Sequence, residues 1–409
     1  MPVGGLFKQR MLFLSKLALC GVANAPRAGL SKMNIARAVF FLGLLVWLLC
    51  PAPARGQEIQ LLSRPLGVLW KYETDGTVNF TPALGGGSIY LPLQDGEVVA
   101  LRAADGELNW RAEMGGNISA APAVDGLALY VASETENVSA PAGKTRPVMG
   151  AIRSVGRQSG VTLWLRTLPA PIRGKLVFDE TAVFGGAEDG RLYALKKETG
   201  EVLWIRQHSS PFLSQPVTSG GKIFIGDEAG NLFAVEQKTG RTLWRYQTRK
   251  ALRAPVGVVA ETVYAGSHDG YVYALDASSG ALRWRARTGG AVQAVIPAGR
   301  CLVVTSLDNF AYCLSPRKGY RIWKRQLPGR VAAQPLVTSD GILLAPLSGE
   351  ECVVLDPRDG RKLNSINVGE DNNTSASPLL SGPLLFVTTR KGLYAYSGTE
   401  ARAQGSAGP

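Results

Sequence analysis

The stretch that decides the fold is Ala194-Leu195-Lys196-Lys197-Glu198-Thr199-Gly200-Glu201-Val202-Leu203-Trp204, because it recurs along the chain. Similar segments cover residues 100–110, 234–244 and 274–284, and each of them ends in a tryptophan. Tryptophans of this kind recur at nearly constant spacing, and only the interval from Trp110 to Trp164 is clearly longer than the others. A period of about 40 is typical of an array in which each unit buries a face against its neighbours. The tryptophans of the array are Trp70, Trp110, Trp164, Trp204, Trp244, Trp284 and Trp323.

Further features fall into register with each tryptophan. In the unit that ends at Trp284 these are a proline start at Ala254-Pro255, apolar runs at Val263-Tyr264-Ala265 and Val272-Tyr273-Ala274-Leu275, and turns at Asp269-Gly270 and Ser279-Gly280. Short runs rich in Val, Ile and Tyr between Gly, Asp and Pro are typical of β-strands at hairpin spacing. After Gly56 the chain shows no sustained apolar period of the kind that indicates a helix. The unit is therefore four antiparallel strands, which is the size of a propeller blade.

The number of units follows from counting strand sets. Complete sets start near residues 78, 118, 172, 212, 252, 291 and 331, and an eighth set starts near 374 but stops at Tyr394-Ala395-Tyr396 without its tryptophan strand. The segment Val68-Leu69-Trp70-Lys71-Tyr72 is a tryptophan strand without the other three. We therefore predict an all-β, eight-bladed β-propeller of four-stranded antiparallel blades, with the ring closed by the N-terminal tryptophan strand. Closure removes the two free edges of an open array.

A glycine lies four residues before the tryptophan position of each unit. It is expected either to turn the chain with φ > 0 or to let the indole lie on bare backbone. Unit seven has Asn364 in place of the tryptophan, so we expect the joint between blades seven and eight to be the weakest. The glycines are Gly106, Gly160, Gly200, Gly240, Gly280, Gly319 and Gly360.

The segment 1–56 has the composition of an export leader. It carries seven Lys or Arg, no Asp or Glu, and one long apolar run, Ala38 to Cys50, followed by small residues. This arrangement is typical of a signal peptide that starts at Met33, or at Met1, and is cleaved after Ala54 or Gly56. The run is too short to span a membrane. We expect a leader over 1–56 with the signal peptide at 33–56, a propeller over 57–398 and a disordered tail over 399–409.

Cys50 is a candidate site for a lipid anchor. The preceding Trp47-Leu48-Leu49 lacks the small residue that bacterial lipoprotein signals carry before the cysteine. We therefore predict an exported, periplasmic protein, with outer-membrane association as the alternative that an anchor would add.

Charge argues against a nucleic-acid partner. Without the leader the chain has 38 basic and 32 acidic residues, so its net charge is only +6, spread over positions 57–409. Nucleic-acid binding needs clustered phosphate contacts. Three cysteines remain in this part of the chain, and Cys301 and Cys313 lie on the two arms of one expected hairpin. They form either a disulfide or a pair of small apolar residues in the sheet.

The segment 194–204 and its counterparts resemble the tryptophan-docking repeat of the pyrroloquinoline-quinone-dehydrogenase-like propellers, and the resemblance covers nearly the whole chain after the leader. The resemblance implies that each indole is held between neighbouring blades. Size, eight blades and a signal peptide look most like the propeller subunit of the outer-membrane β-barrel assembly machinery. This implies a non-catalytic, periplasmic protein-interaction scaffold in outer-membrane protein assembly, with protein partners.

An alternative is a degenerate quinoprotein that binds a quinone or another small ligand in the central channel. The quinone enzymes resemble one another in a disulfide between adjacent cysteines, and this chain has no Cys-Cys pair. They also need a cation, its oxygen ligands and a carboxylate base. The only histidines, His208 and His268, lie far apart in the sequence and predict no metal site. We expect no enzyme activity, no cofactor, no metal and no small-molecule ligand. Gly85-Gly86-Gly87 precedes a strand and is expected to be a loop.

Two surface features remain as candidates for contacts. Basic residues recur on the last strand of each unit, where they either protect the blade edge from pairing or form a positive belt for anionic lipid. These residues are Lys71, Arg111, Arg166, Arg206, Arg245, Arg285 and Lys324. The second feature is an insertion over 134–149 in unit two, where other units have a short turn. It is the candidate partner loop, with Pro141, Lys144, Arg146 and Pro147 as its candidate contact residues.

Overall fold

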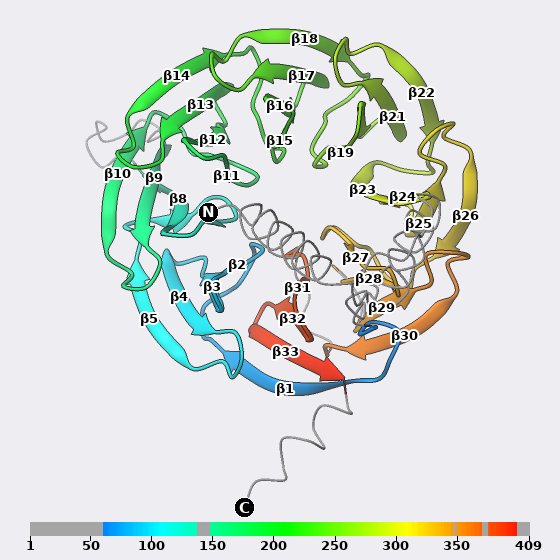
Figure 1. The fold of residues 1–409 in the computed structure, drawn as a ribbon, viewed down its shortest axis with the longest axis horizontal. Coiled ribbons are helices and arrows are strands. Elements are labelled where there is room, and N and C mark those ends of the chain that lie inside the picture. The colour runs from blue at the N-terminus through cyan, green and yellow to red at the C-terminus, as the bar shows by residue number, and fades with distance from the viewer. Residues whose placement is uncertain (1–59, 137–147, 346, 348–349, 370–374, 399–409) are drawn as a thin grey trace, which may run out of the picture. The chain divides into compact units, whose positions relative to one another are not determined.

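The structure is a computed structural model that describes residues 60–136, 148–345, 347, 350–369 and 375–398. These residues belong to the compact unit Ile59–Pro409. They form antiparallel sheets that follow one another around a ring (Figure 1). The prediction of an all-β, eight-bladed propeller is therefore confirmed. No helix among the described residues has the length and apolar character needed to cross a membrane.

We number the blades in chain order, and the strands of each blade are given in their order from the centre of the ring to its rim (Figure 1). Blade 1 contains β2 (Ala83–Gly85), β3 (Ser88–Pro92), β4 (Glu97–Arg102) and β5 (Leu108–Glu113). Blade 2 contains the short inner strands β6 (Asn117–Ile118) and β7 (Ala123–Val124), then β8 (Ala128–Glu136), β9 (Val148–Gly156) and β10 (Thr162–Leu168). Blade 3 contains β11 (Val177–Phe178), β12 (Ala182–Gly186), β13 (Arg191–Lys196) and β14 (Val202–Gln207). Blade 4 contains β15 (Val217–Ser219), β16 (Lys222–Gly226), β17 (Asn231–Glu236) and β18 (Thr242–Gln247).

The second half of the ring repeats this order. Blade 5 contains β19 (Gly257–Val259), β20 (Thr262–Gly266), β21 (Tyr271–Asp276) and β22 (Leu282–Arg287). Blade 6 contains β23 (Val292–Ala298), β24 (Cys301–Ser306), β25 (Phe310–Leu314) and β26 (Arg321–Gln326). Blade 7 contains β27 (Leu336–Val337), β28 (Ile342–Leu344), β29 (Glu351–Leu355) and β30 (Lys362–Asn367). Blade 8 contains β31 (Leu379–Ser381), β32 (Leu384–Thr389), β33 (Gly392–Gly398) and, from the other end of the chain, β1 (Leu66–Glu73).

The ring closes through the pairing of β1 with β33. The two strands are antiparallel, with Trp70 opposite Ala395 and Tyr72 opposite Leu393. In Figure 1 the blue strand β1 lies on the rim side of the red strand β33. The predicted closure by the N-terminal tryptophan strand is therefore confirmed.

A β-bulge lies just before the tryptophan position in every blade. In blade 3, Ala194 pairs with Trp204 and Leu195 pairs with Val202, so Leu203 has no partner in the ladder. A bulge re-aims the side chains around it. Here the side chain of Leu203 is exposed, whereas Trp204 is buried against the next blade.

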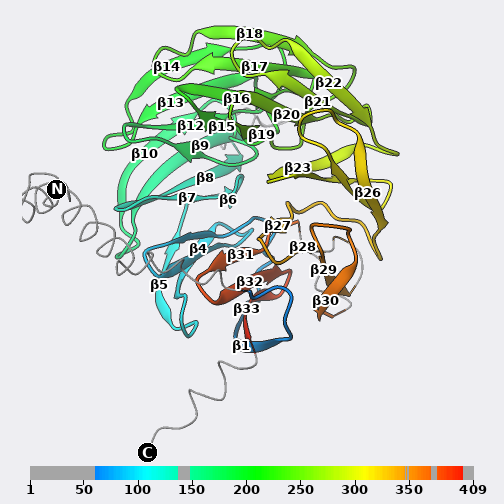
Figure 2. The ribbon, with the colours of Figure 1, turned by 45° about the vertical axis from the view of Figure 1, so that its right-hand side comes forward.

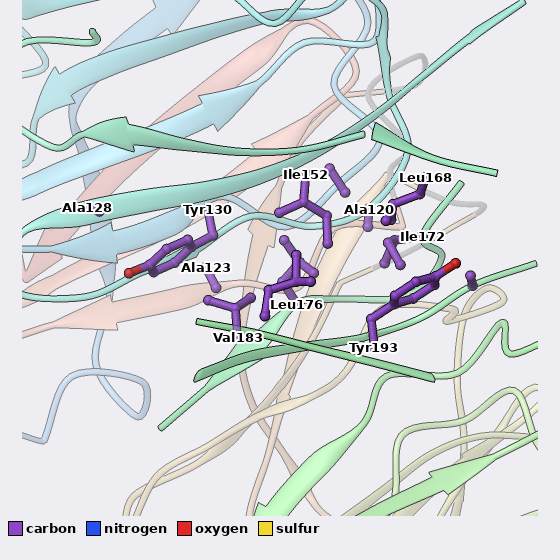
Figure 3. Packing of buried hydrophobic residues seen from close by; sticks show 13 residues of the cluster. Ala120, Ala123, Ala128, Tyr130, Ile152, Leu168, Ile172, Leu176, Val183 and Tyr193 are labelled. Carbon is purple, nitrogen blue, oxygen red and sulfur yellow. The ribbon is translucent and has the colours of Figure 1, made fainter. Parts of the chain in front are cut away.

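The hydrophobic core consists of clusters between adjacent blades. Figure 3 shows the cluster between blades 2 and 3, where Tyr130 and Ile152 of blade 2 pack with Leu176 and Val183 of blade 3. In the turned view each sheet lies beside the next in chain order (Figure 2). Most of the buried apolar surface is therefore shared between blades, and no single blade has a complete core of its own.

The joint between blades 7 and 8 is built differently from the others. Blade 8 has no turn between its last two strands, because β33 and β1 come from opposite ends of the chain. An indole at position 364 would therefore have no glycine turn to dock on. Asn364 Nδ2 instead donates to the carbonyl oxygen of Arg64 at 2.5 Å, and Leu62 is completely buried with apolar residues of blades 7 and 8. The backbone N–H and the Oγ of Ser63 both donate to Asp340 Oδ2, at 3.0 and 3.1 Å.

The insertion in blade 2 differs from its expected form. We expected 134–149 to replace a turn, but the ladder of β8 and β9 continues into it, with Glu134 opposite Gly150 and Glu136 opposite Val148. The hairpin is therefore longer than expected, because residues that the other repeats lack also take part in the pairing of β8 with β9. The candidate residues Pro141, Lys144, Arg146 and Pro147 lie outside the described residues.

The cysteine alternative is resolved in favour of a bridge. Cys301 on β24 and Cys313 on β25 form a disulfide, with their Cα atoms 5.3 Å apart. Cys352 is a free cysteine in the core of blade 7. Burial raises the pKa of the Cys352 thiol to about 12, so this cysteine is a structural apolar residue.

We expect Leu62→Ala to lower the free energy of unfolding by about 2–5 kcal/mol, because it empties a fully buried site in the closing joint. Leu127→Ala is the control, since Leu127 is 85% exposed and its truncation should change stability by less than about 0.5 kcal/mol. Urea unfolding of both variants measures the difference. Equal midpoints would show that the segment before β1 does not support the joint.

Candidate functional site

The tryptophans of the array form the contacts that position one blade on the next. Trp204 Nε1 donates to the carbonyl oxygen of Gln237 in blade 4 at 3.1 Å. The indole lies on Gly240, whose φ is +69°, and a Cβ built on Gly240 would be 2.6 Å from Trp204 Cδ2. Gly240 is therefore needed twice, for its left-handed backbone and for its missing side chain.

The same contact recurs at seven joints. Each indole Nε1 donates to a carbonyl oxygen in the last turn of the following blade, at 2.7–3.2 Å. The pairs are Trp70 with Ala103, Trp110 with Arg157, Trp164 with Lys197, Trp204 with Gln237, Trp244 with Ala277, Trp284 with Pro316, and Trp323 with Pro357. These tryptophans hold the ring together and place no reactive group in a cavity.

The basic residues of the rim fall into two groups, which differ in their position after the tryptophan. Arg166 and Arg206, two residues after a tryptophan, point the same way as the indole, and each donates Nε to a carbonyl of the next blade's glycine turn, at 2.9 and 3.0 Å. Basic residues one position after a tryptophan project to the opposite side of the strand. Of these, Lys324 Nζ lies 3.6 Å from the ring centre of Phe310 in its own blade. Several of these cations therefore have partners within the ring.

The centre of the ring contains a cavity of about 490 Å³. It is lined by the short segments that lead into the innermost strands. In seven blades the residue two positions before the innermost strand belongs to its wall, namely Thr81, Ala121, Lys175, Gln215, Pro255, Gln334 and Ser377. Equivalent positions of the repeat thus converge on one site, and this is the candidate functional site.

Hydrogen bonds connect these lining segments across the cavity. Gln334 Nε2 of blade 7 donates to Gln215 Oε1 of blade 4 at 3.2 Å. The backbone N–H of Gln334 donates to Ser377 Oγ at 3.0 Å, and the N–H of Ser377 donates to Thr81 Oγ1 at 2.8 Å. Hydrogen bonds therefore hold the lining segments of blades 7, 8 and 1 to one another. The sequence contained a signal for this, since a polar residue precedes proline at most of these starts, but it did not show that these residues face the channel.

The charged groups of the lining that the structure describes are cationic. Arg253 forms a bidentate pair with Glu228, at 2.8 and 2.6 Å. The pKa of His268 lies below its ordinary value, first because of burial and then because Arg253 is near. The pKa of Lys175 is lowered by burial. No carboxylate lines the described part of the cavity.

The donor set does not fit a calcium-bound quinone. Calcium takes carboxylate, carbonyl and amide oxygens, and a quinone dehydrogenase also uses a carboxylate base. The described lining offers amides but no carboxylate, and the described residues contain no group of three His, Cys, Asp or Glu that could hold a metal ion. His208 lies away from this cavity, with its ring centre 4.3 Å from that of Phe233.

Fold and docking contacts define the class of this protein as an eight-bladed propeller of tryptophan-docking repeats. A family model described as outer membrane protein assembly factor BamB matches residues 55–146, 148–253 and 247–404. The chain belongs to this family. No curated protein matches the chain.

Solved structures share the fold at low sequence identity. The crystal structure of BamB from Moraxella catarrhalis is 13% identical, with a TM-score of 0.70, and the match covers 81% of this chain and 100% of that chain. The computationally designed Ika8 protein is 14% identical, with a TM-score of 0.69, over 81% and 99% of the two chains. The quinohemoprotein alcohol dehydrogenase from Comamonas testosteroni is 12% identical, with a TM-score of 0.67, over 83% and 78%. These likenesses support the fold alone.

A matched pair of glycine variants separates indole docking from backbone strain. Gly240→Ala and Gly220→Ala both place alanine at a positive φ, but only the first meets an indole, because nothing lies within 4 Å of a Cβ at Gly220. Both should lose about 1–2 kcal/mol of stability from the backbone. Gly240→Ala should lose about 1–3 kcal/mol more from the clash with Trp204. Urea unfolding checks this, and equal losses would contradict the docking role of Gly240.

We expect added pyrroloquinoline quinone to show no calcium-dependent change in its visible absorbance with the purified protein. The reason is the lack of carboxylates in the described cavity lining. The titration compares calcium chloride with magnesium chloride at equal ionic strength. A band that appears with calcium alone would show that the donor set has been misjudged.

Proposed function

We propose that this protein is a non-catalytic periplasmic scaffold that binds outer-membrane assembly proteins through the elongated hairpin of blade 2. Membership in the BamB family supports a protein-interaction scaffold in general. The observation that supports this particular surface is the length of β8 and β9. Each has nine residues, whereas the corresponding strands of blade 3, β12 and β13, have five and six.

The base of this hairpin is fixed to the neighbouring blade. Arg173, which leads into blade 3, contacts Glu134 Oε2 at 2.8 Å and Glu188 Oε2 at 2.8 Å. The ladder from Ala128 to Glu136 is continuous with the blade. These contacts hold the base of the hairpin against blade 3.

The sequence of the insertion suggests the chemistry of the partner. Residues 137–147 contain Lys144, Arg146 and the prolines Pro141 and Pro147, and they contain no Asp or Glu. A basic segment of this kind is complementary to an acidic protein surface. We therefore assign Pro141, Lys144, Arg146 and Pro147 as the proposed contact residues.

The proposed location rests on the leader. Residues 1–56 carry the features of an export signal, with the signal peptide at 33–56, and we propose that the propeller functions in the periplasm. Association with the outer membrane would follow from its partners or from a lipid on Cys50. The intact mass of the exported protein decides between these two.

The test is affinity purification of the exported protein from an outer-membrane fraction, followed by mass spectrometry. We compare the wild type with a variant in which residues 137–147 are replaced by Asn-Gly, and with the double variant Lys144→Glu, Arg146→Glu. The charge control is Lys238→Glu with Arg241→Glu, because both residues are exposed on blade 4. We expect outer-membrane assembly proteins to co-purify with the wild type and the control, and to be reduced at least about tenfold with the other two variants.

Each other outcome is informative. Assembly proteins that remain bound to the Asn-Gly variant would place the contact elsewhere on the ring. Recovery of no assembly protein with any form would refute the scaffold role. Circular dichroism and melting temperature of each variant confirm that the propeller is intact, which we expect because β8 and β9 remain joined by a two-residue turn.

A further inference from the structure

The central cavity has the composition of an anion-binding site. Among the described residues, three titratable side chains line it, Lys175, Arg253 and His268, and all three are basic. Its described lining contains no Asp or Glu. A site of this kind attracts a negatively charged ligand.

Two of the three basic groups contribute little net charge. The guanidinium of Arg253 is paired with both carboxylate oxygens of Glu228. The imidazole of His268 has a lowered pKa, since it is partly buried and near Arg253, so it favours the neutral form. The remaining charge of the described lining is that of Lys175.

Lys175 lacks a counter-ion within the described part of the chain. No Asp or Glu of that part lies within 4 Å of its Nζ, in contrast to Arg173 two residues earlier, which contacts two carboxylates. Burial lowers the pKa of Lys175, because a desolvated ammonium without an anion is unfavourable. A bound anion would remove this penalty.

The position of Lys175 in the repeat is the second observation. It stands where other blades place Thr81, Gln215 or Ser377, and it is the only charged residue among the seven equivalent lining residues. Its neighbour Gly174 lies so close to blade 4 that a Cβ there would be 2.5 Å from the carbonyl oxygen of Ser214. The backbone that leads into Lys175 therefore contacts the segment of blade 4 that carries Gln215, and Gln215 accepts a hydrogen bond from Gln334.

The rest of the wall favours an organic ligand. Amides of Gln215, Gln293 and Gln334 offer donors and acceptors, while Phe80 and Leu213 add apolar surface. A cavity of about 490 Å³ lies in the range of small-molecule sites. An inorganic anion would leave the apolar part of this wall unused.

We propose that the central cavity binds a small organic anion whose carboxylate pairs with Lys175 Nζ. The amide side chains bind polar groups of the ligand, and its carbon skeleton contacts the apolar wall. This site is independent of the hairpin of blade 2. Neither proposal requires the other, and ligand binding here is compatible with a scaffold role.

The test uses isothermal calorimetry and melting temperature with the intact exported protein. The probes are succinate, glucuronate, glucose as the neutral counterpart of glucuronate, and inorganic phosphate. The variants are Lys175→Met, Lys175→Arg and, as a control, Lys238→Met, because Lys238 is exposed on blade 4. We expect at least one carboxylate to bind the wild type and Lys238→Met, with affinity reduced about tenfold or more in Lys175→Met and largely kept in Lys175→Arg. Glucose should not bind.

Two further readouts keep the proposal falsifiable. Without a ligand, Lys175→Met should melt no lower than the wild type, because it removes a half-buried charge that has no partner among the described residues. A lower melting temperature would indicate a structural role. Failure of every carboxylate to bind, or binding that survives Lys175→Met, would overturn the proposal. Phosphate binding as tight as that of the best carboxylate would overturn the organic character of the ligand.

Discussion

The indole that lies on a bare glycine turn of the next blade is the contact on which the ring depends. It combines a large apolar contact with a hydrogen bond from Nε1, as Trp204 shows with Gly240 and Gln237. An aromatic side chain buries about 150–250 Å². Because neighbouring blades share their core, this contact sets both the spacing and the rotation between sheets. The bulge before each tryptophan is part of the same device, since it re-aims the strand where the indole leaves it.

This contact also explains the exception at blade 8. Docking requires a turn in the following blade, and ring closure between β33 and β1 removes that turn. Asn364 occupies the tryptophan position in blade 7, and its amide Nδ2 donates to carbonyl oxygens of the segment that leads into β1. Leu62, which lies in the segment before β1, packs in the apolar cluster between blades 7 and 8. A ring closed by non-covalent pairing thus needs a second, different joint.

The sequence predicted the repeat, the number of blades and the closing strand, because each leaves a periodic trace in residue type. It did not predict the bulge at Leu203, since a single unpaired residue does not change the period of the repeat. It also did not predict the hydrogen bond between Asn364 and the segment around Leu62, because that bond joins parts of the chain that are far apart in sequence. The candidate site was missed for the same reason. Lys175, Gln215 and Gln334 line one cavity only because the eight blades bring their strand starts together at the centre of the ring.

The docking contact limits where such a chain can acquire function. The two outer strands and their turn are fixed by the indole and its glycine, and the middle strands are fixed by the core between blades. The residues left to vary are the hairpin turns and the segments that lead to the inner strands. The long hairpin β8–β9 departs from the repeat at a hairpin turn. Lys175 departs from it in a segment that leads to an inner strand. In a repeat protein these departures are the more informative positions, because the shared pattern already accounts for the rest.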